Sequence, residues 1–197
     1  MTNLFVPRAP SDIAKLVHAY PLCWIVSGGS DNRLATPLPL LPETDSEGNV
    51  SALFGHIGRS NPQQAALERD TLAAILCMGP QGYISPQLVS SPLWGPTWNY
   101  SVCRFEVDVE FVPNETDLAL SRLAEALEGH EEGAWRPERM GLRYEKLKQR
   151  IIAFRAHVRE AHPRFKLGQD ESDITFGEIV DGLSDRGLAN WMKQARG

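Results

Sequence analysis

The sequence predicts an α+β protein built on an antiparallel β-barrel, and three observations support this fold class. Short segments rich in β-forming residues recur through the first half of the chain. One later segment alternates strictly between apolar and polar residues, and helical patterns lie between and after the strands instead of in regular βαβ order. The 197 residues suit one domain with a sizeable core. We predict a barrel domain over residues 1–182 and a C-terminal helical tail over 183–197.

The first half of the chain carries the signals of four strands and two short helices. Ser11 and Asp12 can cap the first helix, and Pro21 prevents its continuation. Pro37 and Pro39 cannot donate to a β-ladder, so their strand is expected at an edge or beside a bulge. In chain order, we predict a helix over 11–20, strands over 22–27 and 34–41 with a turn over 28–32, a strand over 49–57, a helix over 63–67 and a strand over 72–78.

The second half begins with a segment over 79–96 that is rich in Gly, Pro and Ser. A long ordered loop of this composition is often a binding loop. The alternation from Trp98 to Phe111 then predicts a long, half-buried strand. The remaining elements that we predict are a helix capped by Asn114 or Thr116 and ending near Leu127, a helical stretch over 144–151, a strand over 154–158, and two tail helices between Asp173 and Ala195 that separate near Ser184.

Charge and composition exclude several classes of protein. The 20 basic and 25 acidic residues give a net charge of -5, which disfavours a protein whose main role is to wrap nucleic acid. The sequence has no secretory leader and no apolar run long enough to span a membrane, so we expect a cytoplasmic protein. Cys23, Cys77 and Cys103 lie in apolar contexts and are interpreted as reduced core residues, and the absence of a C-x-x-C pair disfavours a zinc site.

A first candidate site follows the predicted strand over 49–57. Arg59, Ser60 and Asn61 precede a predicted helix, and a forked guanidinium beside free backbone N–H groups can hold a phosphate. Simple capping of the helix by Ser60 or Asn61 explains the same residues. Both interpretations stay open on spacing alone.

Two further segments combine residue types that suit a planar or anionic ligand. Tyr83 and Ser85 precede the Gly/Pro loop, and residues 96–100 follow it, so aromatic rings lie near hydroxyl and amide groups that can read the edge of a cofactor. Core packing of these rings is the alternative. Arg164 and Lys166 lie close to a glycine, where they contact an anion or are simply solvated at the end of a strand.

These segments, taken in order, resemble successive signatures of the PaiB-like family of FMN-binding negative transcriptional regulators. They are His56 with residues 59–63, then residues 83–86, 96–100 and 165–169. The resemblance implies an FMN-binding split β-barrel with added helices, a flavoprotein that forms a homodimer with its cofactor at the subunit interface. The cofactor-binding residues that it implies are Thr36, His56, Arg59, Ser60, Asn61, Tyr83, Ser85, Thr97, Trp98, Asn99, Lys166 and Gln169.

The resemblance also implies roles for single residues. Arg59, Ser60 and Asn61 would hold the FMN phosphate, and Thr36 and Thr97 would bond the ribityl chain or the ring edge. Trp98 or Tyr100 would pack beside the isoalloxazine. Pro37 stands where the family commonly has histidine, so a cofactor contact through that side chain is absent.

The family also contains haem-dependent piperazate synthases, so haem is the alternative cofactor. His56, and less readily His157, would then be the axial ligand, and no other metal ligand is predicted. The residues assign no acid–base pair or nucleophile, so the sequence does not separate the two roles that the resemblance implies, a transcriptional regulator and a flavin-dependent oxidoreductase acting on a small molecule. Direct DNA binding is not expected, because the basic stretch over 143–150 is interrupted by Glu145.

Overall fold

The protein is a closed six-stranded antiparallel barrel with the strand order β1-β2-β3-β6-β5-β4, which confirms the predicted fold class. The computed structural model describes residues 4–28 and 33–197, so most of the predicted turn over 28–32 lies outside the described residues. The strands are β1 (Leu22–Ser27), β2 (Leu34–Thr44), β3 (Val50–Gly58), β4 (Leu72–Ile84), β5 (Thr97–Phe111) and β6 (Ile151–Lys166). The helices are α1 (Ser11–Ala19), α2 (Pro62–Arg69), α3 (Thr116–Glu128), α4 (Leu142–Lys148), α5 (Asp173–Gly182) and α6 (Arg186–Arg196).

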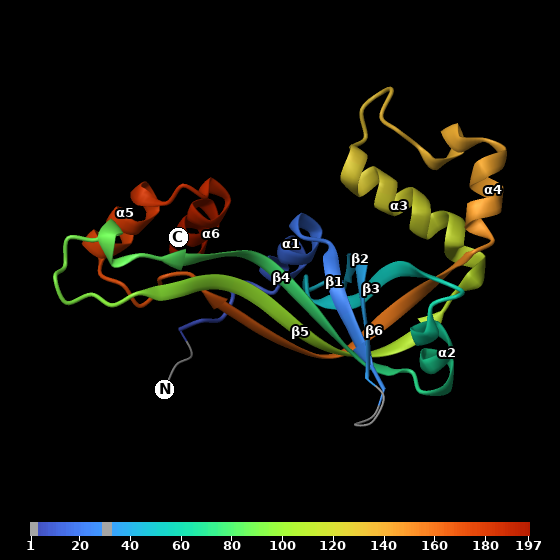
Figure 1. The fold of residues 1–197 in the computed structure, drawn as a ribbon, viewed down its shortest axis with the longest axis horizontal. Coiled ribbons are helices and arrows are strands. Elements are labelled where there is room, and N and C mark those ends of the chain that lie inside the picture. The colour runs from blue at the N-terminus through green and yellow to red at the C-terminus, as the bar shows by residue number, and fades with distance from the viewer. Residues whose placement is uncertain (1–3, 29–32) are drawn as a thin grey trace.

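β4, β5 and β6 are the three longest of the six strands, and β2 and β3 contain 11 and 9 residues. β4, β5 and β6 contain 13, 15 and 16 residues, whereas β1 contains 6. The excess length extends from the barrel as a three-stranded arm, over which α5 and α6 lie (Figure 1). The helix α6 buries Leu188, Ala189 and Met192 in the same apolar cluster as the barrel interior, so the arm and the barrel share one core.

Helices cover the barrel at separate positions. α1 contributes the fully buried Leu16 and Val17 to the core, and α2 contributes Leu67. The connection from β5 to β6 forms a lobe of α3 and α4, which lies on the opposite side of the molecule from the arm (Figure 1). None of the described helices is both long and apolar enough to cross a membrane.

The strand β4 is longer than predicted. The sequence predicts that it ends at Met78, but it continues to Ile84 after a register shift between Met78 and Gln81. Gly79 and Pro80 lie in this bulge. The bulge allows the strand to continue through two residue types that normally interrupt a strand. The predicted loop over 79–96 therefore contributes its first part to the arm.

The prolines of β2 are accommodated differently from the prediction, because a closed barrel has no edge strand. The first half of β2 pairs with β1, with Pro37 opposite Trp24 and Pro39 opposite Leu22. The pairing of β2 with β3 begins only at Leu40. Both prolines thus lie in the part of β2 that pairs with β1 only. As in an edge strand, one side of β2 needs no hydrogen-bond donor there, so proline is tolerated.

The interpretation of the cysteines as three reduced residues is wrong for two of them. Cys23 on β1 and Cys77 on β4 form a disulfide across neighbouring strands, with their Cα atoms 4.6 Å apart. Trp24 pairs with Leu76, so the strand register brings the two cysteines together although they are distant in sequence. Cys103 is free and buried, and burial raises the pKa of its thiol to about 12.

Two predicted helix caps are also wrong. The helix α3 begins at Thr116 after Glu115, and no side chain caps it; the hydroxyl of Thr116 instead donates to the carbonyl of Pro113 at 2.9 Å. The helix α1 begins after Pro10 without a side-chain cap, and the carboxylate of Asp12 accepts a hydrogen bond from the backbone N–H of Ala9. At the start of each of these two helices, the expected capping side chain forms a hydrogen bond with a local backbone carbonyl or amide group instead.

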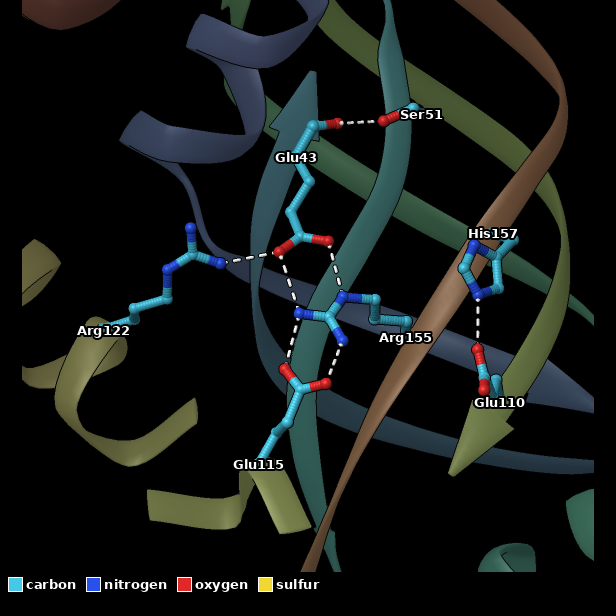
Figure 2. Close-up of polar contacts among 7 residues, drawn as sticks. All are labelled: Glu43, Ser51, Glu110, Glu115, Arg122, Arg155 and His157. Carbon is cyan, nitrogen blue, oxygen red and sulfur yellow. Dashed lines mark hydrogen bonds and ion pairs between the residues drawn. The ribbon is translucent and has the colours of Figure 1, made fainter. Parts of the chain in front are cut away.

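A network of charged side chains fastens the α3 lobe to the barrel. Arg155 on β6 donates to Glu43 through Nε at 2.8 Å and makes two hydrogen bonds to Glu115, at 2.6 and 2.7 Å (Figure 2). Arg122 on α3 reaches the same Glu43 carboxylate at 2.6 Å. Both guanidinium groups lie over the ring of Phe54, at 4.6 Å for Arg155 and 5.6 Å for Arg122. Arg155 therefore joins β2, β6 and the start of α3.

The same contacts set the protonation of the two carboxyl groups. Burial alone would raise the pKa of Glu43, but hydrogen bonds from Arg155 and Arg122 outweigh it, and the net pKa is lowered. The hydrogen bonds from Arg155 lower the pKa of Glu115. A carboxyl group with a lowered pKa in the folded state stabilises the fold above its unfolded pKa, and that stabilisation is lost as the pH falls through the folded value.

We expect Arg155→Met to lower the free energy of unfolding at pH 7 by about 1–2 kcal/mol, because charge-assisted hydrogen bonds to two carboxylates are lost. The deficit should shrink as the pH falls below the ordinary glutamate range and through the lowered pKa values of the two carboxyl groups in the folded state. Urea unfolding at pH 7 and pH 3 measures both effects, and Arg122→Met, which removes one hydrogen bond, is the milder control. A deficit that is equal at the two pH values would contradict this account.

Candidate functional site

The predicted site residues form two groups at different places in the fold. Thr36, His56, Arg59, Ser60 and Asn61 lie on β2, on β3 and at the start of α2. The remaining residues lie on the arm or at its end, and they are Tyr83, Ser85, Thr97, Trp98, Asn99, Lys166 and Gln169.

The first group is organised by the start of α2. The side chain of Asn61 accepts a hydrogen bond from the backbone N–H of Gln63 at 2.9 Å, which confirms the capping interpretation for this residue. Its Nδ2 also donates to the hydroxyl of Thr36 at 3.2 Å. Asn61 therefore links α2 to β2, and the first N–H groups of the helix are already engaged.

Gln63 completes this attachment. Its buried Nε2 lies within hydrogen-bond distance of three acceptors: the carbonyl of Ile25 at 3.0 Å, the hydroxyl of Ser27 at 3.0 Å and the carbonyl of Leu34 at 3.2 Å. These acceptors belong to β1 and β2, so one side chain holds α2 against both strands. The sequence motif thus contains structural residues among the predicted ligands.

Arg59 and Ser60 differ from their neighbours because both are exposed. Neither side chain forms a hydrogen bond or ion pair with a described residue. The backbone of Arg59 is nevertheless fixed, since its N–H donates to the carbonyl of Arg150 at 2.8 Å. A guanidinium and a hydroxyl with free donors on a fixed backbone can receive an anion.

His56 lies on β3, opposite Ala153 of β6. Its Nδ1 atom is buried and has no hydrogen-bond partner among the described residues. Burial lowers the pKa of His56, so the imidazole is neutral at pH 7 and keeps a lone pair available.

The second group is built by the ends of β4, β5 and β6. The rings of Tyr83 and Trp98 pair across β4 and β5 with their centroids 5.9 Å apart, and both side chains are about half exposed. Trp98 Nε1 donates to Gln81 at 2.6 Å. The core interpretation is therefore wrong for these two rings, which present aromatic surface to solvent at an angle of 59° to one another.

Polar residues of the arm have defined partners. The ammonium of Lys166 donates to the hydroxyl of Thr97 between β6 and β5. Asn99 is buried and donates to the sulfur of Met192 in α6 at 3.6 Å. Ser85 caps the short 3-10 helix at Pro86–Leu88, and the amide of Gln169 closes the turn after β6 through bonds to Phe165 and Leu167. Lys166 and Thr97 remain the arm residues best suited to a ligand.

The two groups are separated by the length of β6. His56 lies beside Ala153 near the beginning of this strand, and Lys166 is its last residue. At about 3.3 Å per residue, the stretch of β6 from Ala153 to Lys166 spans roughly 43 Å. The helix α2 and the outer end of the arm lie at opposite sides of the molecule (Figure 1). One chain therefore does not bring the two groups into one site.

The structure also reveals a surface hollow that sequence reasoning missed. The hollow has a volume of about 370 Å³ and is lined by the ends of β1 and β4, by β5 and by three arginines: Arg33, Arg104 and Arg159. These arginines come from separate segments, so only the strand register shows that they converge. The alternation of the strand that begins at Trp98 places Arg104 on the polar face, but the sequence does not predict that the three arginines share a hollow.

Beside the hollow lies an exposed apolar face on β1 and β4, which we call the β1–β4 face. It consists of Leu22, Trp24, Leu76 and Met78, of which Leu22 is 62% exposed and Trp24 49%. These residues flank the disulfide cysteines on the outer side of the barrel, and they line a trough that reaches Arg104 and His162. An apolar patch of this kind on a barrel wall typically marks an interaction surface.

A group of potential metal ligands occupies the charged side of this surface. Glu106, Glu160 and His162 place their ligand atoms within 4.8 Å of one another. Arg104, however, donates to Glu106 at 2.7 Å, and His162 Nε2 lies 3.4 Å from Glu160. We interpret the group as surface ion pairs, since a guanidinium already neutralises one of the carboxylates.

The sequence matches the family model described as "Putative FMN-binding domain" over residues 2–160. The chain belongs to this family. The protease synthase and sporulation protein PAI 2 of Bacillus subtilis is 24% identical over 175 residues, which cover 87% of this chain and 82% of that protein. Membership of the PaiB-like family, expected from four sequence blocks, is confirmed.

Solved structures support the same fold. The FAD and haem binding protein of Mycobacterium smegmatis superposes with a TM-score of 0.59 at 14% identity, covering 87% of this chain and 77% of that one. The flavocytochrome Anf3 of Azotobacter vinelandii gives a TM-score of 0.58 at 15% identity, with coverages of 81% and 76%. At these identities the likeness concerns the split-barrel fold.

The structural and ligand-binding members of the α2 motif can be separated by mutation. We expect Asn61→Ala to cost about 1 kcal/mol of stability, because the helix loses its cap and its bond to Thr36. Arg59→Ala, two residues away, should leave stability unchanged because its side chain has no partner among the described residues. Thermal unfolding of both variants measures the difference. Equal destabilisation would mean that Arg59 is also structural.

Proposed function

We propose that this chain binds FMN as a homodimer in which each cofactor site combines the α2 group of one copy with the arm group of the other. The observation that carries the proposal is the separation of the two groups along β6 in a chain whose family is defined by FMN binding. A site made from both groups requires a second copy. The β1–β4 face supplies an apolar surface that such a copy would cover.

The α2 group suits the phosphate end of FMN. Arg59 offers a forked set of donors and Ser60 a hydroxyl, and both are free to turn toward an anion. Asn61 and Gln63 hold the underlying helix in place, so binding would not have to order the backbone first. In this assignment, Asn61 and Thr36 position the site and Arg59 and Ser60 contact the phosphate.

The arm group suits the ring system. Tyr83 and Trp98 offer exposed aromatic surface, and Lys166 and Thr97 place an ammonium and a hydroxyl at the adjacent strand ends. Bound FMN would supply one- and two-electron transfer at its isoalloxazine ring. The chain would supply stacking area, exclusion of water and a cation that stabilises negative charge on the reduced ring.

Mixing two defective variants tests the shared site. Arg59→Ala and Lys166→Ala should each weaken FMN binding at least tenfold, since each removes a charge-assisted contact. In a mixed dimer of the two variants, one site carries both changes and the other carries neither. Refolding or subunit exchange of the mixture should therefore restore tight binding at up to one site in each mixed dimer, measured by quenching of flavin fluorescence.

Light scattering of the wild-type protein provides the companion measurement, with a dimer expected. A monomer that binds FMN tightly, or a mixture that recovers no binding, would contradict the shared site. Reduction of the bound flavin by NADH or NADPH would favour a flavin-dependent oxidoreductase over a transcriptional regulator, the two roles that the resemblance implies. FMN that is bound but not reduced by either nucleotide would favour the regulator.

A second candidate function is haem binding through His56. The observation that favours it is the buried Nδ1 atom without a described partner, on an imidazole that burial keeps neutral. Neutral imidazole is the form that ligates haem iron.

The absorption spectrum after addition of haemin tests this candidate. We expect a Soret band in the wild-type protein that is lost in His56→Ala and kept in His157→Ala, because His157 is exposed and bonded to Glu110 at 2.9 Å. A Soret band that survives His56→Ala would remove the assignment of this ligand.

A further inference from the structure

We propose that the arginine-lined hollow is a binding site for a phosphate monoester. The proposal does not rest on the assignment of FMN to the α2 and arm groups. Its observations are the concave surface, the convergence of Arg33, Arg104 and Arg159 upon it, and the charge that results.

The geometry of β6 explains why Arg159 reaches the hollow. Glu106 pairs with Glu160, but the next pair is Val107 with Val158, so Arg159 is the extra residue of a β-bulge. A bulge of this kind re-aims side chains and interrupts the regular alternation. Arg159 and Glu160 are therefore both exposed although they are consecutive.

The charge of the hollow matches a dianion. Among the described lining residues, three arginines face one carboxylate, that of Glu106, so these residues carry a net charge of +2 in a chain whose total is -5. Arg104 donates to Glu106 at 2.7 Å, and Arg33 and Arg159 form no hydrogen bond or ion pair with a described residue. The hydrogen bond from Arg104 lowers the pKa of Glu106, and the positive charges of Arg104, His162 and Arg159 act in the same direction.

Guanidinium groups are suited to phosphate because their forked donors match two of its oxygens. A phosphate monoester carries nearly two negative charges at neutral pH, which the lining would balance. The same surplus of positive charge argues against a metal ion at the neighbouring Glu106, Glu160 and His162.

The hollow also lies next to the hydrogen bonds that attach α2 to the barrel. Ser27, which lines the hollow, accepts the hydrogen bond from Gln63, and Leu34, whose carbonyl Gln63 also reaches, directly follows Arg33. The phosphate in the hollow is therefore either that of a flavin bound nearby or that of a separate phosphorylated small molecule. Both have the same chemistry, and the experiment distinguishes them.

Titration calorimetry with inorganic phosphate at fixed ionic strength tests the site. We expect Arg159→Gln and Arg33→Gln each to weaken phosphate binding about tenfold, the loss of one charge-assisted contact. Arg143→Gln is the matched control, because Arg143 is an exposed arginine on α4, remote from the hollow, and the change in net charge is the same. Circular dichroism confirms that each variant is folded.

Phosphate affinity that is unchanged in both hollow variants, or reduced equally by Arg143→Gln, would overturn the proposal. Titrations of FMN and riboflavin then identify the source. If Arg159→Gln weakens the binding of FMN but not that of riboflavin, the hollow holds the phosphate of the flavin. If the variant weakens the binding of inorganic phosphate and leaves the binding of FMN and riboflavin unchanged, the hollow holds a separate phosphorylated ligand. Because the α2 group is itself proposed to bind phosphate, the same titration in Arg59→Ala reports the hollow alone, and failure of the FMN assignment is visible independently.

Discussion

The unequal length of the strands is the constraint on which the rest of the structure depends. A barrel closes only where all six strands run together, and β1 contributes just 6 residues to that shared part. The surplus of β4, β5 and β6 must leave the barrel as an arm, and the apolar face of that arm must be covered. α5 and α6 provide the cover, with Leu188 and Met192 fully buried. The tail is therefore a necessary part of the core that the long strands create.

The arm also determines what kind of site the family signatures can form. The two groups lie beside opposite ends of β6, so residues that belong to one family signature are not brought together within one chain. The α2 group is held by backbone bonds and by Gln63, and the arm group by ladder pairing. Both are rigid, so a conformational change within one chain would have to break the barrel to unite them.

Much of this fold could be predicted because the burial of one face of a strand or helix produces a regular spacing of apolar residues in the sequence. β5 was predicted almost to its ends, since one of its faces lies in the core and the other in solvent. The predicted end of β4 was too early, because Gly79 and Pro80 are typical of a loop and the sequence does not show that a bulge accommodates them. The disulfide was missed for another reason, as Cys23 and Cys77 meet only through the register of two strands. The arginine hollow belongs to the same class of feature, because four segments build it.

The α2 motif shows why the site was harder to predict than the fold. Capping and ligand binding select the same residue types, since both need side chains that bond backbone or phosphate groups. In the structure, the side chains of Asn61 and Gln63 hold the helix α2 in place. The side chains of Arg59 and Ser60 have no hydrogen-bond partner among the described residues, so their donors are available to a ligand. Net charge does not reveal a single binding site for a similar reason. A total of -5 describes the whole surface, whereas an anion responds to the +2 that strand register gathers in one hollow.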